Sequence, residues 1–232
     1  MNLITRLFLI IALGGTVSFA ISNISVSRPS ANGKLDEVLA NMERAARTIK
    51  TIEADMRQEK RDMQIGGKEV YSGKIFFLHD KTCDKVRINY DNPRGQVVAV
   101  LCEEIDLYQP GINQMIVTSR RAQASKNQEF SFIATPYTSV PQLKSQYNIA
   151  YIGDEPVGAS PAAKLDLTPK RKSSVQKLTL WVDQGSWLPI KYLVVEKNNN
   201  VTTFILSNVK KNEKISLDFK LNVPRGTKVI RQ

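Results

Sequence analysis

The sequence contains few of the side chains that carry out chemistry. Its 232 residues include one histidine, His79, and two cysteines, and aromatic residues make up 7% of the chain. A single imidazole excludes zinc sites built from two or three histidines, and two cysteines are too few for a disulfide-stapled scaffold. The motifs G-x-S-x-G, G-x-x-x-x-G-K and H-E-x-x-H are absent. Apolar residues nevertheless reach 42%, which is typical of a globular domain.

The remaining candidates for catalysis are weak. Ser174 with Lys177, and Ser207 with Lys210, fit the spacing S-x-x-K. That pair needs a helical turn to share one face, whereas both matches fall in or beside strand-like segments. A metal site formed by His79, Cys83 and Cys102 is an alternative that requires both thiols to be free. We therefore expect a protein that is not an enzyme and has no cofactor or metal.

Residues 1–20 have the layout of a secretory signal peptide. Arg6 precedes an apolar run over 7–13, and Ser18-Phe19-Ala20 is a small-x-small pattern that predicts cleavage after Ala20. A retained membrane anchor is the alternative, because 7–27 carries no charge, although several polar residues make this stretch a poor bilayer span. We expect residues 21–33 to be a mobile leader and 34–232 to form a single domain.

Export to an oxidising compartment favours a disulfide between Cys83 and Cys102. Residues 85–90 and 95–101 are strand-like and flank a turn at 91–94. If Tyr90 faces Gly95, the same register places the two cysteines opposite each other across a hairpin, on its outer face or rim. Two free thiols that happen to align are the alternative.

One helix and a series of short strands make up the rest of the pattern. Apolar residues from Leu35 to Ile49 recur at helical spacing, and from Thr51 onward the period changes to two. Turn residues then separate segments that include 69–78, 105–109, 114–119, 147–152, 163–167, 177–182, 190–196, 202–208 and 216–222. This predicts an α+β fold, mainly antiparallel, with about ten to eleven strands in a curled, incomplete barrel.

Residues 121–147 lack the alternating pattern of the strand-like segments. Phe130, Phe132 and Tyr137 lie among irregularly spaced apolar residues around Pro136 and Pro141. An apolar but irregular segment must cover an apolar surface, so we expect a short helical lid over an open end of the sheet.

The formal net charge is +11, and +10 without residues 1–20. The basic clusters 120–121, 170–172 and 210–211 lack interleaved aromatic residues, and export argues against nucleic acid. We expect either ordinary solvated turns or attraction to an anionic membrane surface or an acidic partner.

Four segments together resemble the bacterial periplasmic outer-membrane lipoprotein carrier (LolA) family. Residues 49–58 are similar to its I-x-T-h-x-A-x-F-x-Q opening, and 73–77 with 85–93 to its second and third strands. Residues 108–114 fit Y-x-P-x-x-x-Q, and 219–229 fit its F-x-h-x-x-P-x-G-x-x-V tail within one residue. The family's Arg-Pro before the third strand is Thr82-Cys83 here. In the family this arginine helps to latch the lid, and Lys81, Lys85 and Arg87 are the candidates to replace it here.

The resemblance implies a periplasmic, monomeric carrier of lipoprotein acyl chains, which receives its cargo from an inner-membrane transporter and delivers it to an outer-membrane acceptor. Strand parity predicts the cavity residues Ile52, Ala54, Met56, Ile75, Phe77, Val86, Ile88, Leu178, Leu180 and Val182. The predicted lid residues are Leu35, Leu39, Met42, Phe130, Phe132 and Tyr137. All of these residues equally fit ordinary core packing. A same-fold envelope sensor or regulator, or a carrier of another lipid, are the functional alternatives.

Overall fold

The structure, a computed structural model, describes residues 31–120, 122 and 139–232. Its helices are α1 (Ala31–Thr48), η1 (Pro110–Ile112, a 3-10 turn) and α4 (Val140–Gln146). The strands of the first half are β1 (Thr51–Arg61), β2 (Lys68–Leu78), β3 (Lys85–Asn92), β4 (Val97–Leu101), β5 (Glu104–Gln109) and β6 (Gln114–Ser119). Those of the second half are β7 (Tyr147–Asp154), β8 (Ala162–Pro169), β9 (Val175–Asp183), β10 (Pro189–Glu196), β11 (Val201–Lys211) and β12 (Lys228–Arg231).

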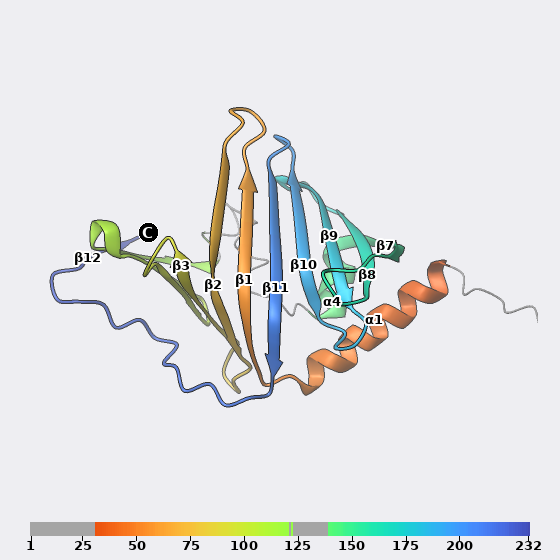
Figure 1. Cartoon of the computed structure of the whole chain (residues 1–232), viewed down its shortest axis with the longest axis horizontal. Coiled ribbons are helices and arrows are strands. Elements are labelled where there is room, and N and C mark those ends of the chain that lie inside the picture. Colours follow the sequence, from red (N-terminus) through yellow and green to blue (C-terminus); the bar gives the residue numbers. More distant parts are fainter. Residues whose placement is uncertain (1–30, 121, 123–138) are drawn as a thin grey trace, which may run out of the picture.

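All twelve of these strands belong to one sheet, in the order β12-β6-β5-β4-β3-β2-β1-β11-β10-β9-β8-β7. Two meanders, β1–β6 and β7–β11, are joined where β1 pairs with β11, and only β12 runs parallel to its neighbour, β6. Strands β12 and β7 stand at the two edges, so the sheet curls without closing (Figure 1). The predicted incomplete barrel is therefore confirmed.

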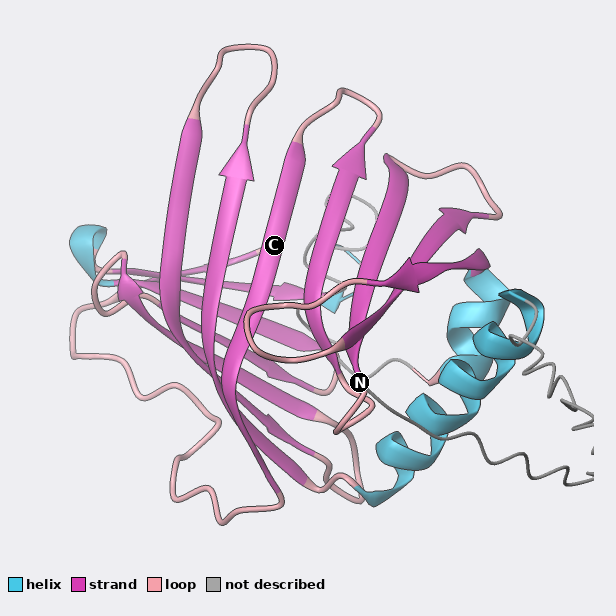
Figure 2. Cartoon of the chain, turned by 45° about the vertical axis from the view of Figure 1, so that its right-hand side comes forward, coloured by secondary structure: helices cyan, strands magenta, loops and turns pink. Residues whose placement is uncertain are grey.

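The sheet bends sharply between β2 and β3, and Gly73 makes this bend possible. A Cβ built on Gly73 would overlap the carbonyl oxygen of Asn89 and lie 2.8 Å from the Cα of Tyr90. The pairing of β2 with β3 also shifts register between Ser72 and Gly73. Glycine is needed where another backbone approaches this closely. Figure 2 shows the strands beyond this point turning away from the direction of β1 and β2.

Helix α1 contacts β7 and α4, and places Val38, Leu39 and Met42 in the buried core. It begins at Ala31, so the last three residues of the predicted leader are helical. Helix α4 starts where the Ser139 hydroxyl accepts the Gln142 N–H, with proline at one of its first two positions. This helix lies in the predicted lid, whose residues 121 and 123–138, like the predicted signal peptide, fall outside the described residues.

The predicted strand 216–222 is wrong. Residues 212–227 form an irregular segment, here called the strap, which leads from β11 to the unpredicted strand β12. The Arg87 guanidinium donates to the Asp218 carbonyl across 2.5 Å, which places the strap over the outer face of β3 (Figure 1). Phe219 and Leu221 are buried, yet neither belongs to the main core cluster. Their alternation arises from packing on a sheet and not from pairing within it.

The predicted register of the β3–β4 hairpin is also wrong by one residue. The Tyr90 N–H donates to the Gln96 carbonyl, and Val86 pairs with Val100. Gly95, with φ +75°, forms an additional turn position that the prediction left out. Cys83 and Cys102 therefore lie just beyond the paired residues and not opposite each other within them.

Candidate functional site

The candidate site is the inner face of the sheet, defined as the face that carries Ile52, Leu180 and Phe204. Alternate residues of every long strand point to it, because side chains alternate between the two faces of a sheet. One register row across seven strands consists of Tyr151, Leu165, Leu180, Tyr192, Phe204, Gln58 and Tyr71. A second row in the first meander consists of Ile52, Phe77, Val86, Val100, Ile105 and Thr118. The two rows make this face almost wholly apolar.

The structure brings all ten predicted cavity residues together on the inner face. Each is at most 5% exposed, and each belongs to the same cluster of contacting core residues. Burial on this scale contributes about 1.5–3 kcal/mol for each large apolar side chain. The cluster therefore stabilises the fold.

The described residues of the predicted lid cover this face from the side of β7. Leu39 and Met42 are buried in the core cluster, and Leu35 is half-buried and packs against it. From α4, Val140 and Leu143 join the same cluster. Phe130, Phe132 and Tyr137 lie outside the described residues. Helices α1 and α4 thus pack apolar side chains against the inner face of the sheet.

Sequence reasoning missed the aromatic residues of the inner face. Tyr90, Tyr192 and Phe204 are buried in the core cluster, and Tyr71 and Trp187 pack against it. The alternation already used for Val86 and Ile88 would have found Tyr90, and the same pattern in β10 and β11 would have found the other two. Tyrosine combines a large apolar surface with a hydroxyl that forms hydrogen bonds.

Polar groups are few on the inner face. Gln58, 3% exposed, is the one amide in the row that contains Phe204 and Tyr192. Burial raises the pKa of the Tyr147 phenol to about 12, so this group stays neutral at physiological pH. Burial and, secondarily, its hydrogen bond to Asp154 raise the pKa of Tyr151 to about 12. The amide and the two phenols named here are therefore uncharged at physiological pH.

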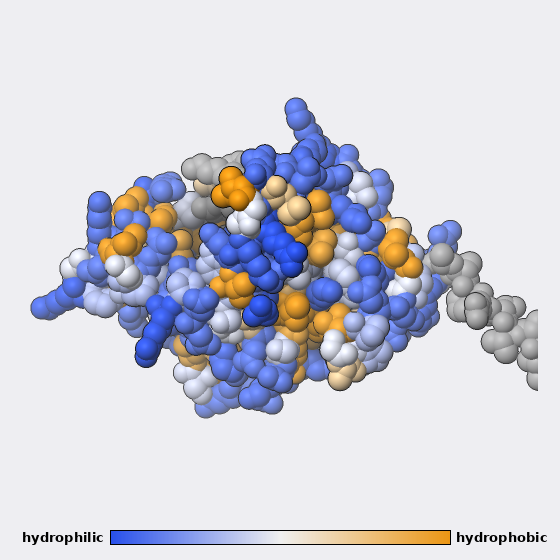
Figure 3. Space-filling view, turned by 45° about the horizontal axis from the view of Figure 1, so that its top comes forward, coloured by the Kyte–Doolittle hydropathy of each residue, from blue (hydrophilic) through white to orange (hydrophobic). Residues whose placement is uncertain are grey.

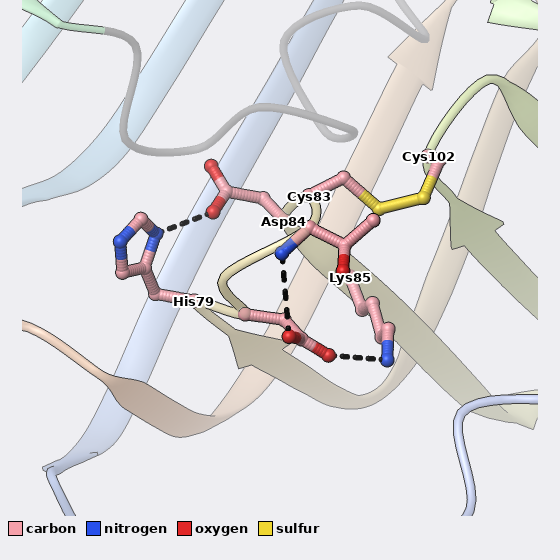
Figure 4. The surroundings of a disulfide bond; sticks show 7 residues. His79, Cys83, Asp84, Lys85 and Cys102 are labelled. Atoms are coloured by element: carbon pink, nitrogen blue, oxygen red, sulfur yellow. Dashed lines mark hydrogen bonds and ion pairs between the residues drawn. A yellow bond between two sulfur atoms is a disulfide. The ribbon is translucent and has the colours of Figure 1, made fainter.

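A disulfide joins Cys83 to Cys102 with their Cα atoms 5.3 Å apart, and so links the β2–β3 turn to the β4–β5 turn (Figure 4). Within the first turn the His79 Nδ1 lies 2.6 Å from Asp84 Oδ1, and the Lys85 Nζ donates to Asp80 Oδ2 across 2.6 Å. Both cysteines are half-buried. The bond consumes both thiols of the alternative metal site.

Of the three residues considered for the lid latch, Arg87 is directed away from the inner face. It shares its register row with Ala99 and Asp106 on the outer face, where it bonds to the strap. Lys85 is engaged by Asp80, and Lys81 is exposed in the turn. No residue is thereby assigned as the latch.

No group of three or more His, Cys, Asp or Glu side chains within 31–120, 122 and 139–232 is arranged to hold a metal ion. Over the same ranges, no helix combines the length and apolar character that a membrane span requires.

One curled, mainly antiparallel sheet, with helices over its apolar inner face, is the fold expected from the resemblance to the lipoprotein carrier family. Residues 47–220 match the model of the family described as outer membrane lipoprotein carrier protein LolA, and the chain belongs to this family. No curated protein matches the chain at the level of its sequence.

Solved structures show the same fold at low sequence identity. An uncharacterized conserved protein from Thermus thermophilus is 13% identical, with a TM-score of 0.56 over 86% of this chain and 99% of that one. A crystal structure of MucB is 16% identical, with a TM-score of 0.55 over 85% of this chain and 65% of that one. A chain of the Pseudomonas aeruginosa MucA/MucB complex is 15% identical, with a TM-score of 0.51 over 82% of this chain and 61% of that one. The chain thus spans less than two thirds of the matched chain in each of these last two structures.

Proposed function

We propose that this protein is a periplasmic, non-catalytic carrier that binds the acyl chains of lipoproteins between the inner face of its sheet and the covering helices. The observation that carries the proposal is the continuous apolar inner face in a member of the lipoprotein carrier family. By the same family membership, the carrier takes its cargo from an inner-membrane lipoprotein-releasing transporter and passes it to an outer-membrane acceptor.

The energetics of acyl chains explain why such a carrier is needed. Each methylene group removed from water is worth about 0.8 kcal/mol, so a chain of about 16 carbons represents roughly 12 kcal/mol. A lipidated protein that left a membrane unaided would expose its acyl chains to water and would meet that cost in full. A carrier must offer a comparable apolar surface and still release the chain, which favours displaceable helices over a closed shell.

The proposal is tested with a fluorescent acyl probe and its displacement by a diacylated lipopeptide, with the same peptide without lipid as a reference. Neighbouring residues of β5 supply a matched pair of variants, because half-buried Leu107 faces the core cluster and half-buried Tyr108 faces outward. We expect Leu107→Gln to weaken probe binding about tenfold, since it replaces an apolar contact by an amide. Tyr108→Gln should bind as wild type.

Two results would count against the carrier. One is a folded protein, by circular dichroism, that binds neither probe nor lipopeptide. The other is equal binding by both variants. Mass spectrometry of amphiphiles that co-purify with the exported protein distinguishes lipoprotein from another lipid as cargo.

The structural similarity to MucB favours a second candidate, a same-fold envelope regulator that binds a protein partner. One of those structures is a complex of MucB with MucA. Affinity capture from the periplasm distinguishes the two candidates. A carrier should retain lipoproteins only while their acyl chains are present, whereas a regulator should retain a non-lipidated partner.

A further inference from the structure

The turn between β1 and β2 exposes two large apolar side chains at the tip of a long hairpin. Met63 is 59% exposed and Ile65 is 83% exposed. The two strands below them pair without interruption from Thr51 with Leu78 to Arg61 with Lys68. The turn extends beyond the strands of the other meander (Figure 2). Neither side chain belongs to the core cluster, and most of the surface of each is left in contact with water.

Four backbone N–H groups of this tip donate hydrogen bonds within the protein. The N–H groups of Gln64 and Ile65 both donate to Asp62 Oδ1, across 2.8 and 3.2 Å. The Met63 N–H donates to Asn200 Oδ1 of the β10–β11 turn across 3.1 Å, and the Asp62 N–H donates to the Gly67 carbonyl. Bonded N–H groups can leave water at low cost, whereas unbonded ones cannot. The N–H groups of residues 62–65, which include those of Met63 and Ile65, thus add little to the cost of moving these side chains into a less polar medium.

Basic turns lie beside the tip. The pairing of Arg61 with Val201 puts the β1–β2 turn next to the β10–β11 turn, where the Lys197 N–H donates to the Ser174 carbonyl of the β8–β9 turn. That last turn carries the exposed residues Lys170, Arg171 and Lys172. In the view of Figure 3, which brings this end forward, hydrophobic side chains emerge among strongly hydrophilic ones.

Charge separates the two ends of the strands. At the tip end, the turns at 62–67, 93–96, 110–113, 170–174 and 197–200 hold five lysines and arginines against one carboxylate. At the opposite end, the turns at 49–50, 79–84, 102–103, 155–161, 184–188 and 212–214, together with Arg120, hold four lysines and arginines against five carboxylates. The protein therefore has a positive end, and that end is the one that exposes Met63 and Ile65.

We infer that this positive end docks on an anionic phospholipid surface, with the basic turns at the headgroups and Met63 and Ile65 inserted beneath them. Cationic residues near such a surface and apolar side chains at its interface contribute independently to binding. This contact belongs to the protein itself, with or without an acyl chain on the inner face. It therefore goes beyond the proposed function and survives if that function is wrong.

The test is co-sedimentation of the exported protein with vesicles of phosphatidylcholine alone and of phosphatidylcholine mixed with phosphatidylglycerol. We expect binding only to the mixed vesicles, and its loss at high salt. The double variant Arg171→Gln/Lys172→Gln should bind about 25-fold more weakly, at about fivefold for each cation. Met63→Gln/Ile65→Gln should bind about tenfold more weakly, because both apolar contacts are lost.

The matched control is Ile152→Gln on edge strand β7, because Ile152 is 53% exposed but lies towards the opposite end of the strands. It should bind like wild type. The inference is overturned if Met63→Gln/Ile65→Gln binds like this control, or if both vesicle types bind equally. Binding only to native membranes that still contain their proteins would also overturn it, and would assign the tip to a protein receptor.

Discussion

Gly73 of β2 lies against Asn89 of β3 so closely that no side chain fits between the two backbones. Replacement by alanine would force the two strands apart at the bend of the sheet. We expect Gly73→Ala to lower the free energy of unfolding by about 2–3 kcal/mol, measured by urea denaturation.

Gly111 is the control for this substitution, because a Cβ there meets no atom within 4 Å and Gly111 lies exposed in η1. Gly111→Ala should change stability by about 0.5 kcal/mol or less. A Gly73→Ala protein as stable as the Gly111→Ala protein would show that the bend does not depend on glycine.

The disulfide should supply a substantial part of the stability of the first meander. Cys83 and Cys102 are 19 residues apart, and cross-linking a loop of that length is worth about 3 kcal/mol through the unfolded state. The Cys83→Ser/Cys102→Ser variant should lose about that amount in urea denaturation. Reductant should destabilise the wild type equally and leave the variant unchanged. Two free thiols in the unreduced exported protein would contradict the bond.

Asp106 should make stability depend on pH in the direction opposite to a salt-bridged carboxylate. It is 3% exposed, and its Oδ1 atom has no hydrogen-bond partner in the described part of the chain. Burial and the nearby Glu104 raise the pKa of Asp106, while Arg231 and Lys220 oppose the shift. The folded state then holds the proton more tightly than the unfolded state, so this group costs stability as pH rises above about 4.

Asp106→Asn should therefore raise the free energy of unfolding by about 1 kcal/mol at pH 7, and by less near pH 3.5. Asp166 provides the contrast, because its carboxylate accepts from the Thr179 hydroxyl at 2.7 Å and from Lys177 at 3.2 Å. Asp166→Asn should destabilise the protein at pH 7. If both substitutions act with the same sign, the assignment of Asp106 is wrong.

The strap depends on Arg87, whose guanidinium donates to the Asp218 carbonyl and to Asn89 Oδ1. Arg87→Met removes both bonds and should lower stability by about 1–2 kcal/mol. Limited trypsin digestion should then cut faster at Lys214 and Lys220 within the strap. Arg57→Met, the same change at an exposed outer-face arginine of β1, should leave the digestion rate unchanged. Equal rates for both variants would argue against the role of Arg87.

Local periodicity was sufficient to predict the inner face. Ile52, Ala54 and Met56 needed only their alternation with Glu53 and Asp55 to be assigned to it, because the period of a strand is independent of its partners. The amphipathic stripe of α1 was equally local. By contrast, Phe219 and Leu221 alternate in the same way but pair with no strand, since a chain crossing over a sheet shows the same pattern as a chain within it.

The hairpin register required information that the sequence pattern does not contain. Whether Tyr90 pairs with Gly95 or Gln96 depends on how the chain turns through residues 91–95, including the left-handed conformation of Gly95. That the basic residues 170–172 lie near the apolar tip at Met63 could not be predicted from the sequence either. They are more than 100 residues apart in the chain, and only the strand order places them at one end.

The pairing of β1 with β11 also has a consequence for the rate of folding. Within each meander every strand pairs with its neighbour in the chain, so those contacts form across short loops. The β1–β11 ladder instead joins residues about 140–160 positions apart, as in the pairs Arg61 with Val201 and Ile52 with Lys211. Closing so long a loop is entropically costly, and non-local strand pairing is intrinsically slow. The pairing of β1 with β11 should therefore be the slow step, after each meander has formed. Substitutions in β1 or β11 should then slow refolding more than substitutions inside either meander.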